Sequence, residues 1–204
     1  MGGYPFVLRL ASPGDLDVVR GLVQNAVRWL RTSKSTDQWT NPWPDEAGAR
    51  ERILNDLIKG KTWIVWDGPA AAATITVDTE EPLVQDDLPV WPVKKRHGMA
   101  LYVRRVIVNR DYSGIGLGAG LLDWAADVAK RDHTAELIRI DVWTTNLDLH
   151  AYYERQRFIR QAGRKRGEIL GYPSQALFER SAGGSGSDYT CLFYEEGRGG
   201  HRCR

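Results

Sequence analysis

The sequence predicts one α/β domain of the mixed α+β kind. The chain has 204 residues, of which 42% are apolar, and this is enough for a full hydrophobic core. Strand-like and helix-like segments follow one another in the order β-α-α-β-β-β-α-β-α-β. In the middle of this order, alternate glycines join a strand-like run to a helix-like run. The chain is therefore expected to build a sheet with helices packed against it.

The first half of the chain begins with a strand at residues 6–10. A helix follows, because Ser12 stands at the N-cap and Pro13 at the first helical position. Apolar residues at helical spacing continue this helix to about Arg31. The further segments are a tryptophan-bearing loop at 32–45, a helix at 46–59, hairpin strands at 62–67 and 71–78, and a long acidic stretch at 79–98.

The second half of the chain is centred on four glycines. A β-branched and aromatic run, 101–108, predicts a strand, and apolar residues at helical spacing from Leu117 to Val128 predict a helix. Between them lie Gly114, Gly116, Gly118 and Gly120. Glycine lets the backbone approach an oxyanion closely, and the N–H groups at a helix start favour negative charge. We therefore expect this junction to bind phosphate rather than to serve only as a tight turn.

Three kinds of phosphate-binding loop compete for this junction. A nucleoside-triphosphate loop needs a Gly-Lys-Ser/Thr ending, and no lysine lies between Lys95 and Lys130. A dinucleotide fingerprint is matched formally by Gly114, Gly116 and Ala119, so a dehydrogenase stays an alternative. Five polar residues precede the first glycine, however, and about a hundred residues come before the motif, which that fingerprint does not favour.

The third kind fits best. The run V-I-V-N-R-D-Y-S-G-I-G-L-G-A-G-L-L over 106–122 resembles the acyl-CoA loop of the GNAT superfamily of N-acetyltransferases, whose pattern is R/Q-x-x-G-x-G/A. Ser113 replaces the usual Arg or Gln of that pattern. The resemblance implies that the following residues contact the acetyl-CoA co-substrate: Val106, Ile107, Val108, Ser113, Gly114, Ile115, Gly116, Leu117, Gly118, Ala119, Asn146 and Tyr153.

A second signature of the same family follows downstream. A strand at 138–143 leads to Asn146, and a helical stretch then ends in Tyr-Glu-Arg-Gln-Arg-Phe at 153–158. By resemblance, Tyr153 protonates the departing CoA thiolate and Asn146 contacts the pantetheine arm while it caps the helix. Arg157 replaces the glycine that usually ends this helix, which costs about 1 kcal/mol if the position requires a positive φ.

The resemblance also implies the architecture. It predicts the GNAT fold: a mixed, mostly antiparallel sheet of about seven strands, flanked by helices on both faces, with a V-shaped splay between the fourth and fifth strands. The family domain is expected over residues 1–180. A glycine- and serine-rich extension, 181–204, would add an edge strand at 189–195 and end in a disordered tail.

The general base is not decided by the sequence. The backbone of 106–108 would polarise the thioester carbonyl, but the strand 101–108 carries arginines and no carboxylate. Asp141 and Glu80 are the leading candidates for the base, and Asp78, Glu81 and His150, or a water chain to one of them, remain open.

The acceptor is expected to be a small cationic amine. The loops 32–45 and 79–98 combine tryptophans with carboxylates, a composition that suits such a ligand. The residues concerned are Asp37, Trp39, Trp43, Asp45, Glu80, Glu81, Asp86, Asp87 and Trp91. A protein lysine or N-terminus is the alternative acceptor, and a non-catalytic acyl-CoA sensor is the alternative function.

Composition limits the partners and the compartment. A net charge of +2, with basic residues scattered, does not favour nucleic acid as a partner, and no apolar run is long enough to cross a membrane. Cys191 and Cys203 stand in no metal or disulfide pattern and fit a reducing compartment. We expect a cytoplasmic monomer or homodimer without a metal.

Overall fold

The computed structural model describes residues 6–81, 83–84, 88–91, 99–162, 171–183 and 189–198. Within this part of the chain, eight strands form one sheet in the order β10-β1-β2-β3-β6-β7-β9-β8. The strands are β1 (Phe6–Leu10), β2 (Thr62–Asp67), β3 (Ala70–Asp78), β6 (Ala100–Val108), β7 (Leu137–Val142), β8 (Ile159–Gln161), β9 (Ala176–Ser181) and β10 (Phe193–Glu195). Two pairs, β1 with β10 and β6 with β7, are parallel and the other pairs are antiparallel.

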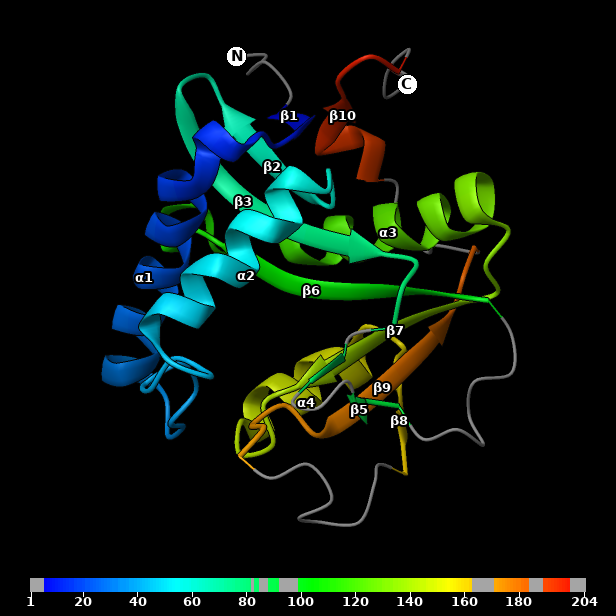
Figure 1. The fold of residues 1–204 in the computed structure, drawn as a ribbon. Coiled ribbons are helices and arrows are strands. Elements are labelled where there is room, and N and C mark those ends of the chain that lie inside the picture. The colour runs from blue at the N-terminus through cyan, green and yellow to red at the C-terminus, as the bar shows by residue number, and fades with distance from the viewer. Residues whose placement is uncertain are drawn as a thin grey trace.

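Helices cover both faces of this sheet (Figure 1). They are α1 (Leu16–Ser33), α2 (Glu46–Ile58), α3 (Leu117–His133) and α4 (Leu147–Arg155). Alternation along β2 separates the faces: Ile64 packs with α1 and α2, whereas Val65 belongs to the cluster that contains α3. The expected α/β fold with a mixed, mostly antiparallel sheet is confirmed.

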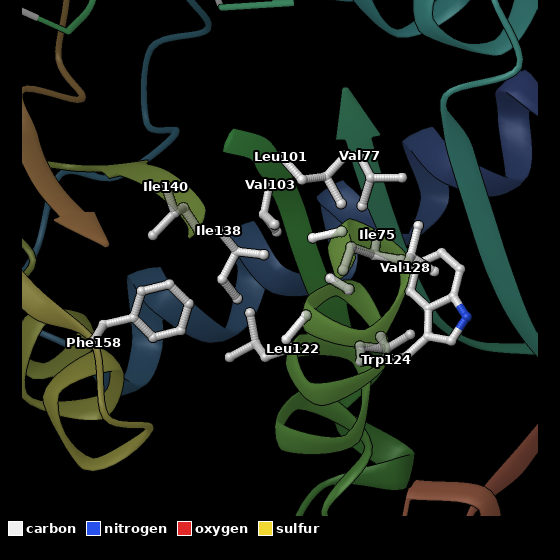
Figure 2. Close-up of a cluster of buried hydrophobic side chains, with 14 of the residues drawn as sticks. Ile75, Val77, Leu101, Val103, Leu122, Trp124, Val128, Ile138, Ile140 and Phe158 are labelled. Atoms are coloured by element: carbon white, nitrogen blue, oxygen red, sulfur yellow. The ribbon is translucent and has the colours of Figure 1, made fainter. Parts of the chain in front are cut away.

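The largest part of the core lies between α3 and the middle of the sheet. Figure 2 shows Leu122, Trp124 and Val128 of α3 directed toward side chains of β3, β6 and β7. Trp124 and Leu122 are at most 1% exposed. The helix therefore packs against both β6 and β7 and holds these two strands in place.

The strands β6 and β7 pair over only part of their lengths. Their register covers three positions, from Ala100 opposite Leu137 to Tyr102 opposite Arg139. Beyond these positions the strands diverge, which confirms the predicted splay between the fourth and fifth strands of the core. The next segment of β6 also carries a bulge, because the pairing with β3 shifts between Thr74 and Thr76. Arg105, in this bulge, has a φ of 47°.

Three short strands were not predicted from the sequence. β8 pairs with β9, and the two-residue strands β4 (Leu83–Val84) and β5 (Leu88–Pro89) form a separate small sheet. As a result the main sheet has eight strands rather than about seven. Of the two candidates for the last core strand, the segment at 176–181 pairs with β7 inside the sheet, and β10 pairs with β1 at its edge.

The C-terminal segment corrects one expectation. Cys191 is disulfide-bonded, although the sequence showed no disulfide pattern. Most of the glycine- and serine-rich connector and the terminal residues 199–204 lie outside the described residues. Within the described ranges, no helix is both long and apolar enough to span a bilayer.

Candidate active site

A cavity of about 530 Å³ opens where β6 and β7 diverge. It is bounded by these strands, by α1 and α2, and by residues of the segments 38–43 and 172–174. From β6, β7 and α4 it receives Arg104, Arg105, Val106, Ile140, Asp141, Val142, Leu149 and Tyr153. Small-molecule sites usually enclose about 300–1,000 Å³, so the cavity has the size of a small ligand.

Tyr153 reaches this cavity through the gap between the strands. Its helix, α4, packs on the same face of the sheet as α3, while the cavity is bounded by α1 and α2 of the other face. Tyr153 is 4% exposed, and its ring contacts Phe158 and Phe178 at centroid distances of 5.4 and 6.1 Å. Burial, and then the charges of Tyr152 and Asp141, raise the pKa of Tyr153 well above its ordinary value, so the phenol is protonated at neutral pH.

Asp141 lies in the same cavity, on the diverging part of β7. The Tyr172 hydroxyl donates a short hydrogen bond to the Asp141 carboxylate. Burial raises the pKa of Asp141, and the hydrogen bond from Tyr172 and the charge of Arg104 oppose this shift only in part. A carboxylate whose pKa is raised toward neutrality accepts a proton more readily than an ordinary aspartate.

The ion pairs behind the cavity hold the bulge of β6. Arg104 Nη2 lies 3.0 Å from Asp56 Oδ1 and 3.1 Å from Asp78 Oδ2. Arg105 Nη1 lies 2.7 Å from Asp56 Oδ2. These four charged side chains are largely buried, and each carboxylate faces an arginine. The strained backbone at Arg105 is therefore fixed by its own side chain.

The glycine-rich junction lies at the other end of the diverging strand. Gly114 and Gly116 have φ values of 85° and 89°, which only glycine adopts without strain. Gly116 is the N-cap of α3, and the residues from Ser113 to Gly116 are exposed. Because the first N–H groups of a helix have no partner within it, the backbone of Leu117, Gly118 and Ala119 adds donors here. The junction thus fits an oxyanion.

The next two glycines are required by packing rather than by φ. A Cβ on Gly118 would lie 2.8 Å from the Tyr152 hydroxyl and 3.6 Å from a methyl group of Val108. A Cβ on Gly120 would lie 2.8 Å from Leu192 Cδ1. A side chain at either position would therefore displace a neighbour, at Gly118 next to the exposed junction and at Gly120 in the C-terminal segment.

The residues of β6 connect the two places. Val106 lines the cavity, and Val108 packs beside Gly118 at the junction. Ile107, between them, is 3% exposed and packs under α1. A ligand that lies along this strand can contact the junction and the cavity at once. Ile115 is 45% exposed at the junction, whereas Leu117 points into the core.

Asn146 joins the tryptophan-bearing loop to the start of α4. Its side-chain oxygen accepts a hydrogen bond from the Leu149 N–H at 3.0 Å, as the predicted cap does. Its amide nitrogen donates to Gln38. The Asp37 carboxylate accepts hydrogen bonds from Trp143 Nε1, at 2.8 Å, and from the Thr145 hydroxyl. Both hydrogen bonds lower the pKa of Asp37, and the one from Thr145 has the larger effect. The loop therefore forms part of the cavity wall.

The other candidates for the base lie outside the lining of the cavity. Glu80 is paired with Lys61, with 3.0 Å between Oε2 and Nζ. The Asp78 carboxylate is held between Lys61 and Arg104, and Glu81 accepts a hydrogen bond from the Trp91 N–H. His150 is buried, and its Nε2 lies 2.9 Å from the Trp143 carbonyl oxygen. Among the predicted bases, the structure thus brings only Asp141 together with Tyr153 in the cavity.

The family can now be assigned. A family model described as the acetyltransferase (GNAT) family matches residues 22–158, about two thirds of the chain. The chain belongs to the GNAT family. It is an acetyl-CoA-dependent acyltransferase, and the GNAT resemblance predicted from the sequence is confirmed.

Individual GNAT proteins resemble this chain at low identity. The Bacillus subtilis protein YesJ, an uncharacterised N-acetyltransferase, is 24% identical over 151 residues, which are 71% of this chain and 76% of YesJ. A GNAT acetyltransferase structure from Listeria monocytogenes has a TM-score of 0.66 at 23% identity and covers 88% of this chain and 96% of its own. The PaiA N-acetyltransferase of Thermoplasma acidophilum, in complex with coenzyme A, has a TM-score of 0.61 at 14% identity. The match covers 87% of this chain and 99% of the PaiA chain.

Two parts of this GNAT site were not predicted from the sequence. Tyr172 comes from a segment with no recognisable pattern, and its bond to Asp141 depends on the return of the chain to β9. The arginines of α1 belong, in the sequence, to basic residues without an evident cluster. Arg20, Arg28 and Arg31 nevertheless recur at helical spacing, and this signal would have placed them on one face.

Proposed function

We propose that the enzyme transfers the acetyl group of acetyl-CoA to the primary amine of a small molecule, by direct attack within a ternary complex. The observation that carries this proposal is that Asp141 and Tyr153 line one cavity at the point where β6 and β7 diverge. The first is suited to accept a proton and the second to donate one. The glycine-rich junction, which follows the end of β6 at Val108, would hold the phosphates of the co-substrate.

The residues divide the proton transfers between them. Asp141 accepts a proton from the ammonium form of the acceptor, which frees the nitrogen lone pair. The N–C bond forms at the thioester carbonyl while the backbone near Val106 polarises its oxygen. As the C–S bond breaks, Tyr153 donates its phenolic proton to the CoA sulfur. A free thiol has a pKa of about 8.5, so protonation by a positioned acid favours departure. The attacking nitrogen loses its second proton to solvent as the amide forms. Solvent then takes the proton held by Asp141 and returns one to Tyr153.

Several of the described carboxylates that were expected to bind a cationic acceptor have other partners. Asp37 accepts hydrogen bonds from Trp143 and Thr145, and Asp45 caps α2 by accepting from the Gly48 N–H at 2.8 Å. Glu80 pairs with Lys61 away from the cavity. Trp39 and Trp43 do line the cavity, whereas Trp91 is buried in the core. The expected acidic residues Asp86 and Asp87 lie outside the described residues.

The test is a calorimetric titration with acetyl-CoA, CoA and NAD. The wild type is compared with the Gly116→Ala/Gly118→Ala double variant and with Gly68→Ala as a control. Gly68 also has a positive φ, of 54°, but lies in the β2–β3 turn with open space around it. We expect binding of both CoA species, no binding of NAD, and at least tenfold weaker CoA binding only in the double variant. Binding of NAD without CoA would overturn the proposal.

A further inference from the structure

The cavity carries an excess of positive charge. Its lining contains seven arginines, namely Arg20, Arg28, Arg31, Arg50, Arg52, Arg104 and Arg105. Among the residues that the structure describes, this lining includes two carboxylates, Glu46 and Asp141. A concave site lined by one sign of charge concentrates ligands of the opposite sign. The question is which of these arginines are available to a ligand.

Three of the seven arginines are already neutralised. Arg104 and Arg105 share Asp56, and Arg104 also pairs with Asp78. Arg20 is paired with Asp17 and Glu46, each at 3.4 Å. These three guanidinium groups therefore form ion pairs within the folded chain.

The other four form a basic wall on α1 and α2, consisting of Arg28, Arg31, Arg50 and Arg52. None of them has a carboxylate partner within 4.0 Å among the described residues. Within the described ranges, the hydrogen bond of the Arg31 guanidinium goes to the Thr40 carbonyl oxygen, at 3.3 Å. In this part of the chain the wall therefore holds positive charge that no carboxylate neutralises.

Two aromatic rings in contact connect one arginine of this wall to the Asp141 carboxylate. The Arg52 guanidinium lies 4.8 Å from the centroid of Trp43. Trp43 packs edge-to-face on Tyr172 at 4.9 Å, and Tyr172 donates to Asp141. Along this side of the cavity, the rings of Tyr172 and Trp43 thus lie between the Asp141 carboxylate and the Arg52 guanidinium. Stacking orients the planar fork of Arg52, and such a fork binds a carboxylate or phosphate through two hydrogen bonds.

We propose that the acceptor is an amino compound that also carries an oxyanion, a carboxylate or a phosphate, which the basic wall binds while its amine faces Asp141. This inference rests on the proposed function, because it names the acceptor class of the same site. The aromatic rings between the two ends contact the carbon skeleton. A diamine or a basic peptide would meet like charge at the wall and is disfavoured.

Binding and turnover are measured separately on matched amines. Ethanolamine is compared with its phosphate ester, and β-alanine with its amide, with 1,4-diaminobutane as the cationic probe. Each is titrated calorimetrically into the enzyme saturated with CoA, and each is assayed for acetylation with acetyl-CoA. The variants are Arg52→Gln and Arg50→Gln. Arg160→Gln is the control, since Arg160 is exposed on β8 and does not line the cavity.

We expect the member of at least one pair that carries the oxyanion to bind at least tenfold more tightly than the member that lacks it. The Arg52→Gln variant should lose this preference, while its affinity for acetyl-CoA and the behaviour of the control stay unchanged. The two pairs distinguish phosphate from carboxylate. Equal or tighter binding of the probes that lack an oxyanion, or a preference that survives in both arginine variants, would overturn the inference. Selective anion binding without acetylation would support the inference and count against the proposed function.

Discussion

The glycine-rich junction and the cavity offer different kinds of chemical groups to a ligand, although one strand connects them. The junction is built from consecutive residues, and its donors are backbone N–H groups that Gly114 and Gly116 leave accessible. The cavity is built from side chains of α1, α2, α4, β6 and β7 and of two loops. Backbone donors serve any relative that uses the same co-substrate, whereas side chains can change without altering the fold.

This difference means that the two regions can be altered separately. A substitution at the junction should change the affinity for CoA, and a substitution in the cavity should change the rate or the choice of acceptor. A substitution at Val106 or Val108, on the strand that connects the two regions, would change both the affinity for CoA and the reaction with the acceptor. The following experiments test this separation, from the largest expected effect to the smallest.

The largest effect is expected from Tyr153→Phe. The substitution removes the proton donor but keeps the ring contacts with Phe158 and Phe178. We expect kcat to fall about 100-fold or more, the contribution usual for a general acid, with little change in the Kd of acetyl-CoA. Tyr194→Phe, on a side chain that is 40% exposed, is the control in steady-state kinetics. If CoA affinity fell as much as kcat did, the two regions would not be separable.

A similar loss of rate, with a gain in stability, is expected from Asp141→Asn. Burial raises the pKa of Asp141 above its ordinary value of 3.8, so the folded state holds this proton more tightly than the unfolded chain does. Ionisation of Asp141 therefore weakens the fold at pH values above the folded pKa, and this cost disappears as the pH falls below the ordinary value. The variant should be more stable than the wild type near pH 7 and lose this advantage in acid.

Thermal unfolding at a series of pH values checks the stability, and kcat against pH checks the catalysis. The wild-type rate should fall as the pH is lowered through the pKa of Asp141, and the variant should be about 100-fold slower at neutral pH. Asp17→Asn, whose side chain is 90% exposed, serves as the control. A variant with unchanged kcat would remove Asp141 from the mechanism.

The pair Gly118→Ala and Gly120→Ala tests the boundary of the junction. Each new methyl group would lie 2.8 Å from a neighbour, the Tyr152 hydroxyl in one case and Leu192 in the other. We expect the first to weaken acetyl-CoA binding about tenfold. The second should leave binding unchanged and destabilise the fold by about 1–3 kcal/mol through overpacking. Calorimetry and thermal unfolding measure both; an equal loss of binding in the two variants would extend the junction to the C-terminal segment.

The smallest effect is expected at Arg157, in neither region. Its φ is 65°, so the helix end needs the left-handed conformation that the sequence suggested, and a non-glycine residue supplies it. Arg157→Gly should raise the free energy of unfolding by about 1 kcal/mol, or the Tm by roughly 2–4 °C, with unchanged kcat. Arg157→Ala keeps the backbone strain and should show no such gain. A stabilising alanine variant would contradict this explanation.

The junction was predictable because its physics is local. A strand, a set of glycines and a helix are consecutive in the sequence, and the positive φ of Gly114 and Gly116 is a demand that only glycine meets easily. The capping role of Asn146 was predictable for the same reason, because its side chain accepts a hydrogen bond from the N–H of Leu149, only three residues later. The main helices and long strands also followed from periodicity.

The cavity could be predicted only in part. Tyr153 followed from a motif, but the choice among the candidate bases depended on which carboxylate the fold neutralises with a cation. The sequence separates Glu80 from Lys61 and Asp78 from Arg104 by about 20 residues or more, so these ion pairs form only in the tertiary structure. The short strand β8 was missed because three residues carry too little periodicity.

The divergence of β6 and β7 has a further consequence for solubility. Strand edges with free N–H and C=O groups ordinarily invite pairing with other chains and lead to aggregation. Here two such edges are created in the middle of the sheet, where α1, α2 and α4 border the gap. A second protein strand, with its side chains, would have to displace these helices, whereas a thin unbranched chain would not. The sheet can therefore keep an unpaired edge in its interior without offering that edge to other proteins.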